Sequence, residues 1–455
     1  MADLHDEADV ASAAIGAPDR PTARGRGSRP ATAPDIPGES GPAPAPARKP
    51  PARKPAPRAA ARKQQPPTAP EPSGATGSAP PPVARPAPER APASAEPAAE
   101  AVAAPAPAPA GSPDPEHLAR VRALLRAHPV ADGYNTLAQV LVQTPWHDVE
   151  LGESSLDTDI PRLRQGGVGA QFWSLVVAAD CPDPVSATLE RVDRLRTLVD
   201  ACPEGLRLAL AAGDLADARN HGRIASLFGP VAAHALGDSL GTVRAYHALG
   251  VRAVALTATA SWTRAGLTRF GQEVVRELNR LGMLIDLSGA APETVRQTLV
   301  AAKAPLVFTR SAARALTDHP LNVTDELLAG LPENGGVCLV SLAPAQVARS
   351  GRAARVQDVA DHVEHLRGVV GPEHIGLSGA YGLTAGAPRT IGLEDASCYP
   401  VLLAELVARG WEDTELAALT WGNLVRVIRD VDFAARATQP RRGPSTATIE
   451  DLDPR

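Results

Sequence analysis

Short apolar runs alternate with amphipathic stretches from about residue 115 to residue 436. The stretches repeat apolar residues at i, i+3, i+4 and i+7, as in "TRFGQEVVRELNRLG" (268–282) and "VQDVADHVEHLRGVVG" (356–371), which predicts helices. The apolar runs are rich in β-branched residues and predict strands. The predicted strands are residues 130–133, 168–177, 206–211, 224–228, 253–257, 283–287, 305–308, 337–342 and 374–377.

Most of the predicted strands are apolar almost throughout, which is typical of parallel strands that are covered on both faces. Eight or nine strand–helix units in roughly 320 residues favour an α/β fold of the (β/α)8 TIM-barrel type, and a doubly wound open sheet is the weaker alternative. The active sites of such barrels lie at the C-terminal ends of the strands. Function should therefore be visible in the residues that end each apolar run.

Composition divides the chain into three segments. Residues 1–113 contain 27 of the 46 prolines and no aromatic residue, so they cannot bury enough apolar surface to offset chain entropy. We expect a disordered, Pro/Ala-rich tail here, partly in polyproline II conformation. The barrel is expected over residues 114–436, and a flexible, charged C-terminal tail over residues 437–455.

The N-terminal tail is locally basic. Eleven Lys or Arg residues and two acids lie between residues 20 and 63, on a chain whose net charge is -5. Such an arm could contact nucleic acid, anionic lipid or an acidic protein. No aromatic side chains are interleaved for base stacking, so a solubilising tail is favoured and no nucleic-acid partner is expected.

The lack of a recognisable targeting signal and of paired cysteine spacing favours a cytoplasmic protein. The start "MADLHDEADV" lacks the basic and apolar regions of a signal peptide, and no apolar run approaches the roughly 20 residues that span a bilayer. The four cysteines have no CxxC spacing, so neither a zinc knuckle nor a disulfide framework is predicted.

The predicted strand ends are poor in catalytic groups. They contain no His, Cys or Glu, and the one nearby acid, Asp286, is expected to accept hydrogen bonds from the backbone. Tyr134, Trp173, Arg310 and Tyr381 are the candidate pocket-lining residues. The Arg310 guanidinium could hold a carboxylate or phosphate, and an internal ion pair or plug is an equal alternative.

Other candidate motifs are weaker. His362 and His365 could share a metal, but they belong to an outer helix and are expected on a partly exposed face. His234 stands alone and is expected to be a hydrogen-bonded structural residue. No phosphate-binding GxxxxGK[ST] loop, GxGxxG fingerprint or GxSxG elbow occurs.

Several segments resemble the membrane (renal) dipeptidase family of zinc peptidases. They include "DIPRLRQGGVGAQFWS", "GLTRFGQEVVRELNRLGMLIDLSG", "APLVFTRSAARAL", "HPLNVTDELL" and "ADHVEHLRGVVGPEHIGLSG", and the resemblance runs from about residue 128 to residue 431. It implies a (β/α)8 barrel, usually dimeric, with two zinc ions at the barrel mouth. A glutamate and a water would bridge the metals, and the water would attack the dipeptide carbonyl.

Other residue types occupy the positions at which the resemblance implies metal ligands. The family's first strand ends Asp-Gly-His-Asn-Asp, and its His and second Asp correspond to Tyr134 and Thr136. Its bridging glutamate corresponds to Val231, and two further histidine ligands correspond to Gly289 and Arg310.

The positions implied to act on substrate are also replaced. The family's carbonyl-polarising histidine corresponds to Ala258, its carboxylate-binding arginine to Leu321, and its proton-handling aspartate to Ala380. We therefore expect a pseudoenzyme without a metal cofactor that acts as a partner subunit, a regulator or a binder of a small anionic or peptide ligand. A homodimer, or a heterodimer with an active paralogue, would follow from the family's dimers.

Two alternatives stay open at this point. One is a dipeptidase that hydrolyses dipeptides through an altered site. The other places the function in the basic tail, with the barrel as an anchor.

Overall fold

The computed structural model describes residues 113–144, 147–152, 155–349, 351–383 and 386–454. The tail expected over residues 1–113 lies outside these ranges apart from residue 113. Within them, no helix combines the length and apolar character needed to cross a bilayer.

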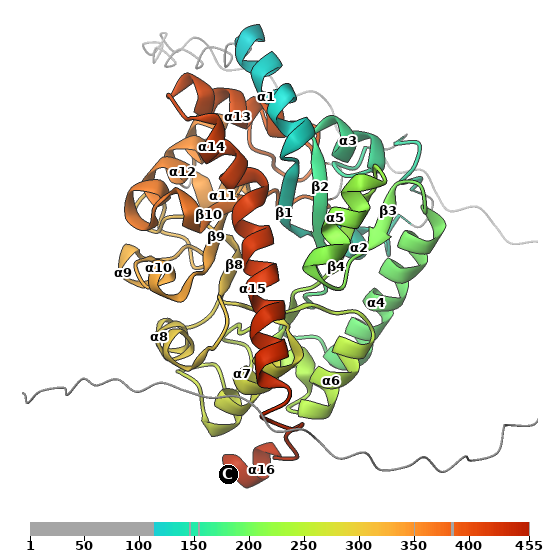
Figure 1. Cartoon of the computed structure of the whole chain (residues 1–455), viewed down its shortest axis with the longest axis vertical. Coiled ribbons are helices and arrows are strands. Elements are labelled where there is room, and N and C mark those ends of the chain that lie inside the picture. Colours follow the sequence, from blue (N-terminus) through green and yellow to red (C-terminus); the bar gives the residue numbers. More distant parts are fainter. Residues whose placement is uncertain (1–112, 145–146, 153–154, 350, 384–385, 455) are drawn as a thin grey trace, which may run out of the picture. The chain divides into compact units, whose positions relative to one another are not determined.

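The described residues form a parallel sheet that curls into a barrel (Figure 1). Its strands are β1 (Val130–Asn135), β2 (Val168–Trp173), β3 (Leu206–Leu208), β4 (Ile224–Phe228), β5 (Val231–Ala232), β6 (Ala253–Ala255), β7 (Leu284–Asp286), β8 (Val307–Ser311), β9 (Val337–Ser341) and β10 (Ile375–Ser378). Their order is β3-β4-β2-β1-β10-β9-β8-β7-β6-β5. β4 leads into β5 through Gly229 and Pro230, and Phe228 of β4 pairs in parallel with Val251 just before β6, so the sheet closes between β4 and the β6–β5 end of this order.

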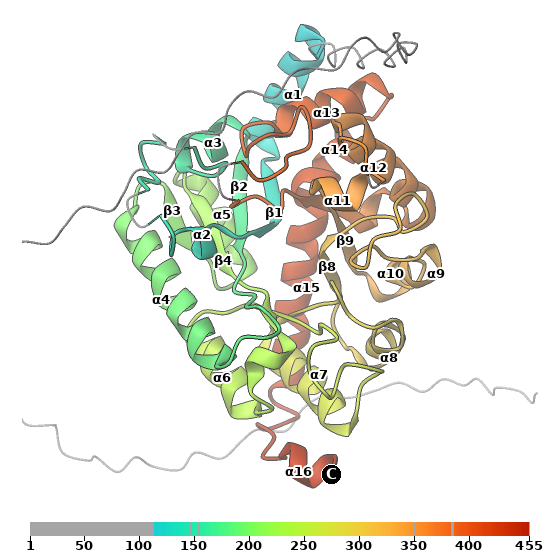
Figure 2. The same cartoon turned by 180° about the vertical axis from the view of Figure 1, so that it is seen from behind.

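Helices cover the outside of the barrel in both views (Figures 1 and 2). The α-helices are α1 (Pro115–Ala127), α2 (Leu137–Val140), α3 (Ile160–Gln165), α4 (Pro184–Ala201), α5 (Ala212–Asn220), α6 (Leu240–Ala248), α7 (Arg269–Leu281), α8 (Pro292–Ala301), α9 (Asp325–Leu328), α10 (Leu331–Asn334), α11 (Pro344–Val347), α12 (Val356–Val370), α13 (Tyr399–Ala408), α14 (Asp413–Ala417), α15 (Asn423–Thr438) and α16 (Ile449–Leu452). Short 3-10 turns η1 (Ala233–Leu236) and η2 (Pro372–His374) and a π-helical turn η3 (Ala418–Gly422) join them.

Local sequence explains where these helices begin and end. The Thr268 side chain accepts a hydrogen bond from the Gly271 amide at the start of α7, and Gly282 ends the helix at a φ of 76°. Both are standard helix boundary signals. Phe270 and Val274 lie on the buried face between them, as the apolar periodicity of this segment predicts.

Small and large apolar side chains together fill the inside of the barrel. Ala131, Ala170, Ala225 and Ala253 belong to one buried cluster with the apolar face of α15. Space is tightest at Gly133, where an added Cβ would lie 2.2 Å from the Leu339 Cδ1. The barrel is therefore a packed core, and any functional site has to lie at one of its ends.

The C-terminal segment differs from the flexible tail expected over residues 437–455. It contains α16, and its Asp453 carboxylate accepts hydrogen bonds from the Arg269 and Phe270 amides at the start of α7. Arg442 pairs with Glu273 on the same helix. The segment has no apolar periodicity, so sequence patterning could not reveal that its charged groups complement those of α7.

Candidate functional site

Tyr134 and Arg310 meet at the C-terminal ends of the strands. Tyr134 lies on β1 and Arg310 on β8, and the guanidinium carbon lies 4.3 Å from the centre of the phenol ring. This is a cation–π contact. Tyr134 is 3% exposed and Arg310 is half-buried, so the tyrosine forms part of the floor of the mouth and the arginine lies over it.

Tyr381 and Trp173, the other two candidate pocket-lining residues, are directed into packing. The Tyr381 hydroxyl donates to the Leu393 carbonyl at 3.2 Å, and its ring meets Tyr399 edge-on with centroids 6.0 Å apart. Tyr381 is 2% exposed and Trp173 is fully buried. These two side chains thus support the mouth from below and do not present a surface to a ligand.

Thr136 is used to join β1 to the loop after β10. Its hydroxyl lies 2.8 Å from the Gly382 carbonyl oxygen and 3.2 Å from that of Tyr381, so it donates to one of them at a time. Its amide also donates to the Tyr381 carbonyl at 2.7 Å. This position is therefore structural here.

An apolar contact occupies the opposite side of the mouth. Gly289 has a φ of 74°, and a Cβ added to it would lie 3.3 Å from the Leu321 Cδ2. The Ala258 amide donates to the Gly289 carbonyl at 3.0 Å, and Val231 is fully buried. These four positions, at which the resemblance implies functional residues, thus provide backbone, a methyl group or an alkyl chain, and none of the four provides a metal ligand.

The buried acids of the mouth are engaged with the backbone. One Asp286 oxygen accepts from the Ser288 and Thr309 amides, both at 2.9 Å, and the other accepts from the Thr309 hydroxyl at 2.6 Å. The expected structural role of Asp286 is confirmed. Burial raises the pKa of Asp286, with these hydrogen bonds opposing the shift.

Asp132 has a similar position on β1. Its Oδ1 accepts from the Tyr134 amide at 3.1 Å and from the Gly379 amide at 2.8 Å, so it ties β1 to the loop after β10. Burial raises the pKa of Asp132 to about 6. Ala380 follows Gly379 with a φ of 51°, a conformation that is uncommon for a residue with a side chain.

The histidines have structural partners. His234 contacts the Thr259 hydroxyl at 2.8 Å and the Ala178 carbonyl at 3.1 Å, as expected for a hydrogen-bonded residue. The expected partly exposed position of His362 is wrong, since it is 1% exposed and its Nδ1 accepts from the Ala313 amide. It occupies the buried side of α12, and burial lowers its pKa to about 4. His365 pairs instead with Asp325 at 2.9 Å.

Two residues of the mouth lie outside the predicted strand ends. His319 lies in the loop after β8, and burial together with the charges of Arg310 and Arg314 lowers its pKa. Arg191 of α4 lies near Tyr134, and its guanidinium donates to the Val176 carbonyl. Both residues lie outside the strands, but the "HPLN" segment that contains His319 already marked this loop as part of a site.

The donor set of the mouth does not fit a zinc pair. Zinc sites use converging thiolates, imidazoles and carboxylates, whereas a phenol, a hydroxyl and a guanidinium stand at the matched positions here. No group of three or more His, Cys, Asp or Glu side chains suited to a metal occurs among the described residues. The fixed positive charge of Arg310 would also repel a cation.

Comparisons with known proteins place these findings in a family. A family model described as "Membrane dipeptidase (Peptidase family M19)" matches residues 118–442. Dipeptidase 3 of Mus musculus is 41% identical over 340 residues, which is 70% of this chain and 68% of the relative. Dipeptidase 3 of Homo sapiens is 41% identical over 338 residues, which is 69% of this chain and 67% of the relative.

Solved structures agree on the fold. The probable dipeptidase PvdM from Pseudomonas aeruginosa superposes with a TM-score of 0.63 at 20% identity, covering 70% of this chain and 99% of that one. A metallo peptidase from Rhodobacter sphaeroides, liganded with a phosphinate mimic of the dipeptide L-Ala-D-Ala, gives 0.61 at 22% identity, covering 67% and 99%. The predicted α/β barrel is confirmed.

Proposed function

Because this chain belongs to the membrane dipeptidase family, we propose that it is a catalytically silent member that acts by binding and not by hydrolysis. The chemistry of the mouth carries this proposal. All eight positions that the resemblance implies for metal or substrate hold other residues, and the side chains of Tyr134 and Thr136 are engaged in internal contacts.

The acids that remain at the mouth are poor substitutes for a catalytic base. A general base must reach the proton that it abstracts. Both oxygens of Asp286 accept the hydrogen bonds described above. Asp132 accepts hydrogen bonds from two backbone amides. Both are buried, so a substrate at the mouth would not meet either carboxylate directly.

Arg310 supports a more specific role in binding an anionic or peptide ligand. Its guanidinium has no carboxylate partner among the described residues and is held over the Tyr134 ring. A guanidinium fixed by an aromatic face can still offer its outward N–H groups to a carboxylate. We propose that the chain works in the cytoplasm as a partner subunit or regulator, in a homodimer or in a heterodimer with an active paralogue.

Metal content and turnover test the proposal on the full chain. After dialysis against zinc and removal of free metal, we expect less than stoichiometric zinc by elemental analysis and no metal-dependent hydrolysis of an L-Ala-D-Ala dipeptide. A family member that keeps the ligand residues serves as the positive control. The Arg310→Ala variant controls for contaminating peptidase, because turnover that this variant leaves unchanged does not arise at the mouth.

The rival function is hydrolysis of dipeptides through the altered site. It predicts stoichiometric zinc and turnover that chelation removes and Arg310→Ala alters. That combination would overturn the proposed silent role.

A further inference from the structure

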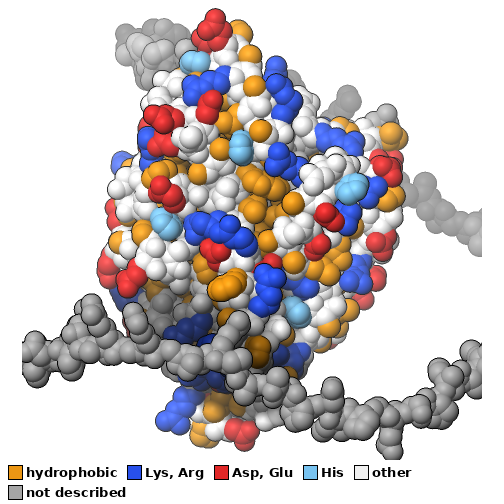
Figure 3. Space-filling view, in the orientation of Figure 1, with side chains coloured by type: hydrophobic (Ala, Val, Ile, Leu, Met, Phe, Trp, Pro, Cys, Tyr) orange, Lys and Arg blue, Asp and Glu red, His pale blue; other side chains and the backbone are white. Residues whose placement is uncertain are grey.

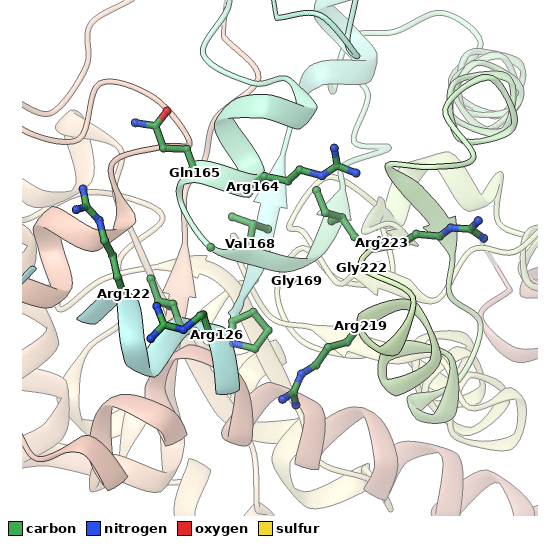
Figure 4. Close-up of a pocket in the computed structure, with 13 residues that line it drawn as sticks. Arg122, Arg126, Arg164, Gln165, Val168, Gly169, Arg219, Gly222 and Arg223 are labelled. Atoms are coloured by element: carbon green, nitrogen blue, oxygen red, sulfur yellow. The ribbon is translucent and has the colours of Figure 1, made fainter. Parts of the chain in front are cut away.

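A second cavity lies at the opposite end of the barrel from the mouth. It is formed where α1 and α3 end, where β2 begins and where the turn from α5 enters β4, and its volume is about 410 Å³ (Figure 4). None of the mouth residues described above lines it. Ligand binding in this cavity is therefore independent of whether the mouth is catalytic.

Arginines dominate the rim of this cavity. Arg122 and Arg126 come from α1, Arg164 from α3, Arg219 from α5 and Arg223 from the turn before β4, and they surround Val168 and Gly169. No acidic side chain lines the cavity. Basic and acidic groups are mixed over the face shown in Figure 3, so this concentration of one sign is local.

Few internal partners neutralise these arginines. Arg223 contacts the Glu204 carboxylate at 3.4 Å, and Arg164 donates to the Glu204 carbonyl at 2.9 Å. The guanidinium groups of Arg122, Arg126 and Arg219 make no hydrogen bond or ion pair with the described residues, and the buried Arg223 Nε lacks an acceptor there. Donors suited to an anion are thus available.

Two sources of negative charge near the cavity oppose the binding of an anion. The C-terminal ends of α1, α3 and α5 each carry at most about half a negative charge, and Glu204 adds one more. Together these amount to about −2.5 against five guanidinium charges, so the cavity stays positive.

The floor of the cavity is apolar. Leu125, Pro129, Val168 and Ile224 line it, and at Gly169 an added Cβ would lie 2.5 Å from the Pro129 Cγ. A ligand with an anionic head and an apolar body would match this division. The volume suits a small molecule, whereas a stable protein partner would have to bury roughly 800 Å² of this surface.

We propose that this arginine-rimmed cavity is a binding site for a small organic phosphate. The phosphoryl group would contact the rim guanidiniums, which match its oxygens in pairs, and the apolar part would lie on the floor. A dianion gains more from several guanidiniums than a single carboxylate does, which favours phosphate.

Phenyl phosphate is a suitable probe for the full chain. By calorimetry at low salt, we expect it to bind more tightly than either inorganic phosphate, which lacks the ring, or phenol, which lacks the charge. The double variant Arg126→Gln/Arg219→Gln should weaken binding by about tenfold or more, because it removes two charge-assisted contacts. Arg196→Gln, which removes an exposed arginine of α4 that does not line the cavity, should leave the affinity unchanged.

Thermal melting of each variant checks that the substitutions at exposed positions leave the fold intact. Equal affinities of the double variant and the wild type would overturn the proposal, as would phenyl phosphate binding no better than phenol. A hexaglutamate peptide that displaces the probe and binds more tightly than it would also overturn it, in favour of an acidic protein segment.

Discussion

At the scale of single residues, positions at which the resemblance implies metal ligands are engaged in internal contacts of the barrel mouth. Tyr134 and Arg310 pair with each other, and Thr136 joins the end of β1 to the loop after β10. Sequence could identify these positions because the strands that carry them follow a recognisable pattern. It could not predict the pairing, because the contact joins side chains whose strands lie far apart in the chain.

The contribution of Asp132 to the stability of the fold depends on pH, and a substitution of this residue should reveal that dependence. Its pKa in the folded state is about 6 against an ordinary value of 3.8, so between these values the folded protein keeps a proton that the unfolded chain releases. Its contribution to stability therefore falls as the pH rises from about 4 to about 6. Asp132→Asn keeps an oxygen that accepts from the Tyr134 and Gly379 amides and removes the buried charge.

We expect the free energy of unfolding of Asp132→Asn, measured with urea, to rise relative to wild type by roughly 2 kcal/mol between pH 4 and pH 7. Asp183→Asn provides a control of opposite sign. The Ser186 side chain and amide lower the pKa of Asp183 below its ordinary value of 3.8, so this variant should lose stability relative to wild type as the pH rises toward about 4, with little further change up to pH 7. Parallel curves for Asp132→Asn and wild type would contradict the assignment.

At the scale of elements, periodicity predicted most strands of the described sheet, and the two helical stretches that were given bounds, to within a few residues. The prediction for residues 224–228 coincides with β4, and that for residues 356–371 coincides closely with α12. β5 was missed because Pro230 interrupts the apolar run, and the C-terminal segment was missed because Ile449 and Leu452, which pack against the core, are too few to form a periodic pattern and its other contacts given above are polar. Apolar periodicity indicates which faces of an element are buried. It does not reveal elements that charge and hydrogen bonding hold in place.

The substitution of one carboxylate tests whether the C-terminal segment packs on α7. Asp453→Ala leaves the Arg269 and Phe270 amides without their acceptor and removes a negative charge from the start of the helix. The loss should be about 1 kcal/mol in the free energy of unfolding. Glu450→Ala is the matched control, since it removes an exposed acid from the neighbouring α16 and should have no comparable effect. If both variants unfold alike, the segment is as loose in solution as its sequence suggests.

At the scale of the whole molecule, the barrel separates two surfaces that can be examined independently. The mouth holds the contact between Tyr134 and Arg310, and the opposite end holds the arginine-rimmed cavity. The packed interior between them includes Gly133, where no side chain fits. A ligand at one end therefore cannot pass to the other, and variants at the two ends should have additive effects.

Truncation distinguishes functions of the barrel from functions of the N-terminal tail. The described core begins with Val121 on α1, and the Asp114 side chain accepts from the Glu116 amide at 2.7 Å to start that helix. Deleting residues 1–113 keeps both features, so we expect the melting temperature by calorimetry to change by no more than about 1 °C. Deleting residues 1–128 is the contrasting control, because it also removes α1, which packs on α13, and should lower the melting temperature by several times as much. A large loss with the shorter deletion would mean that the tail takes part in the fold. If the shorter deletion is harmless to stability but abolishes capture of partners from lysate, the function belongs to the basic tail and the barrel is its anchor.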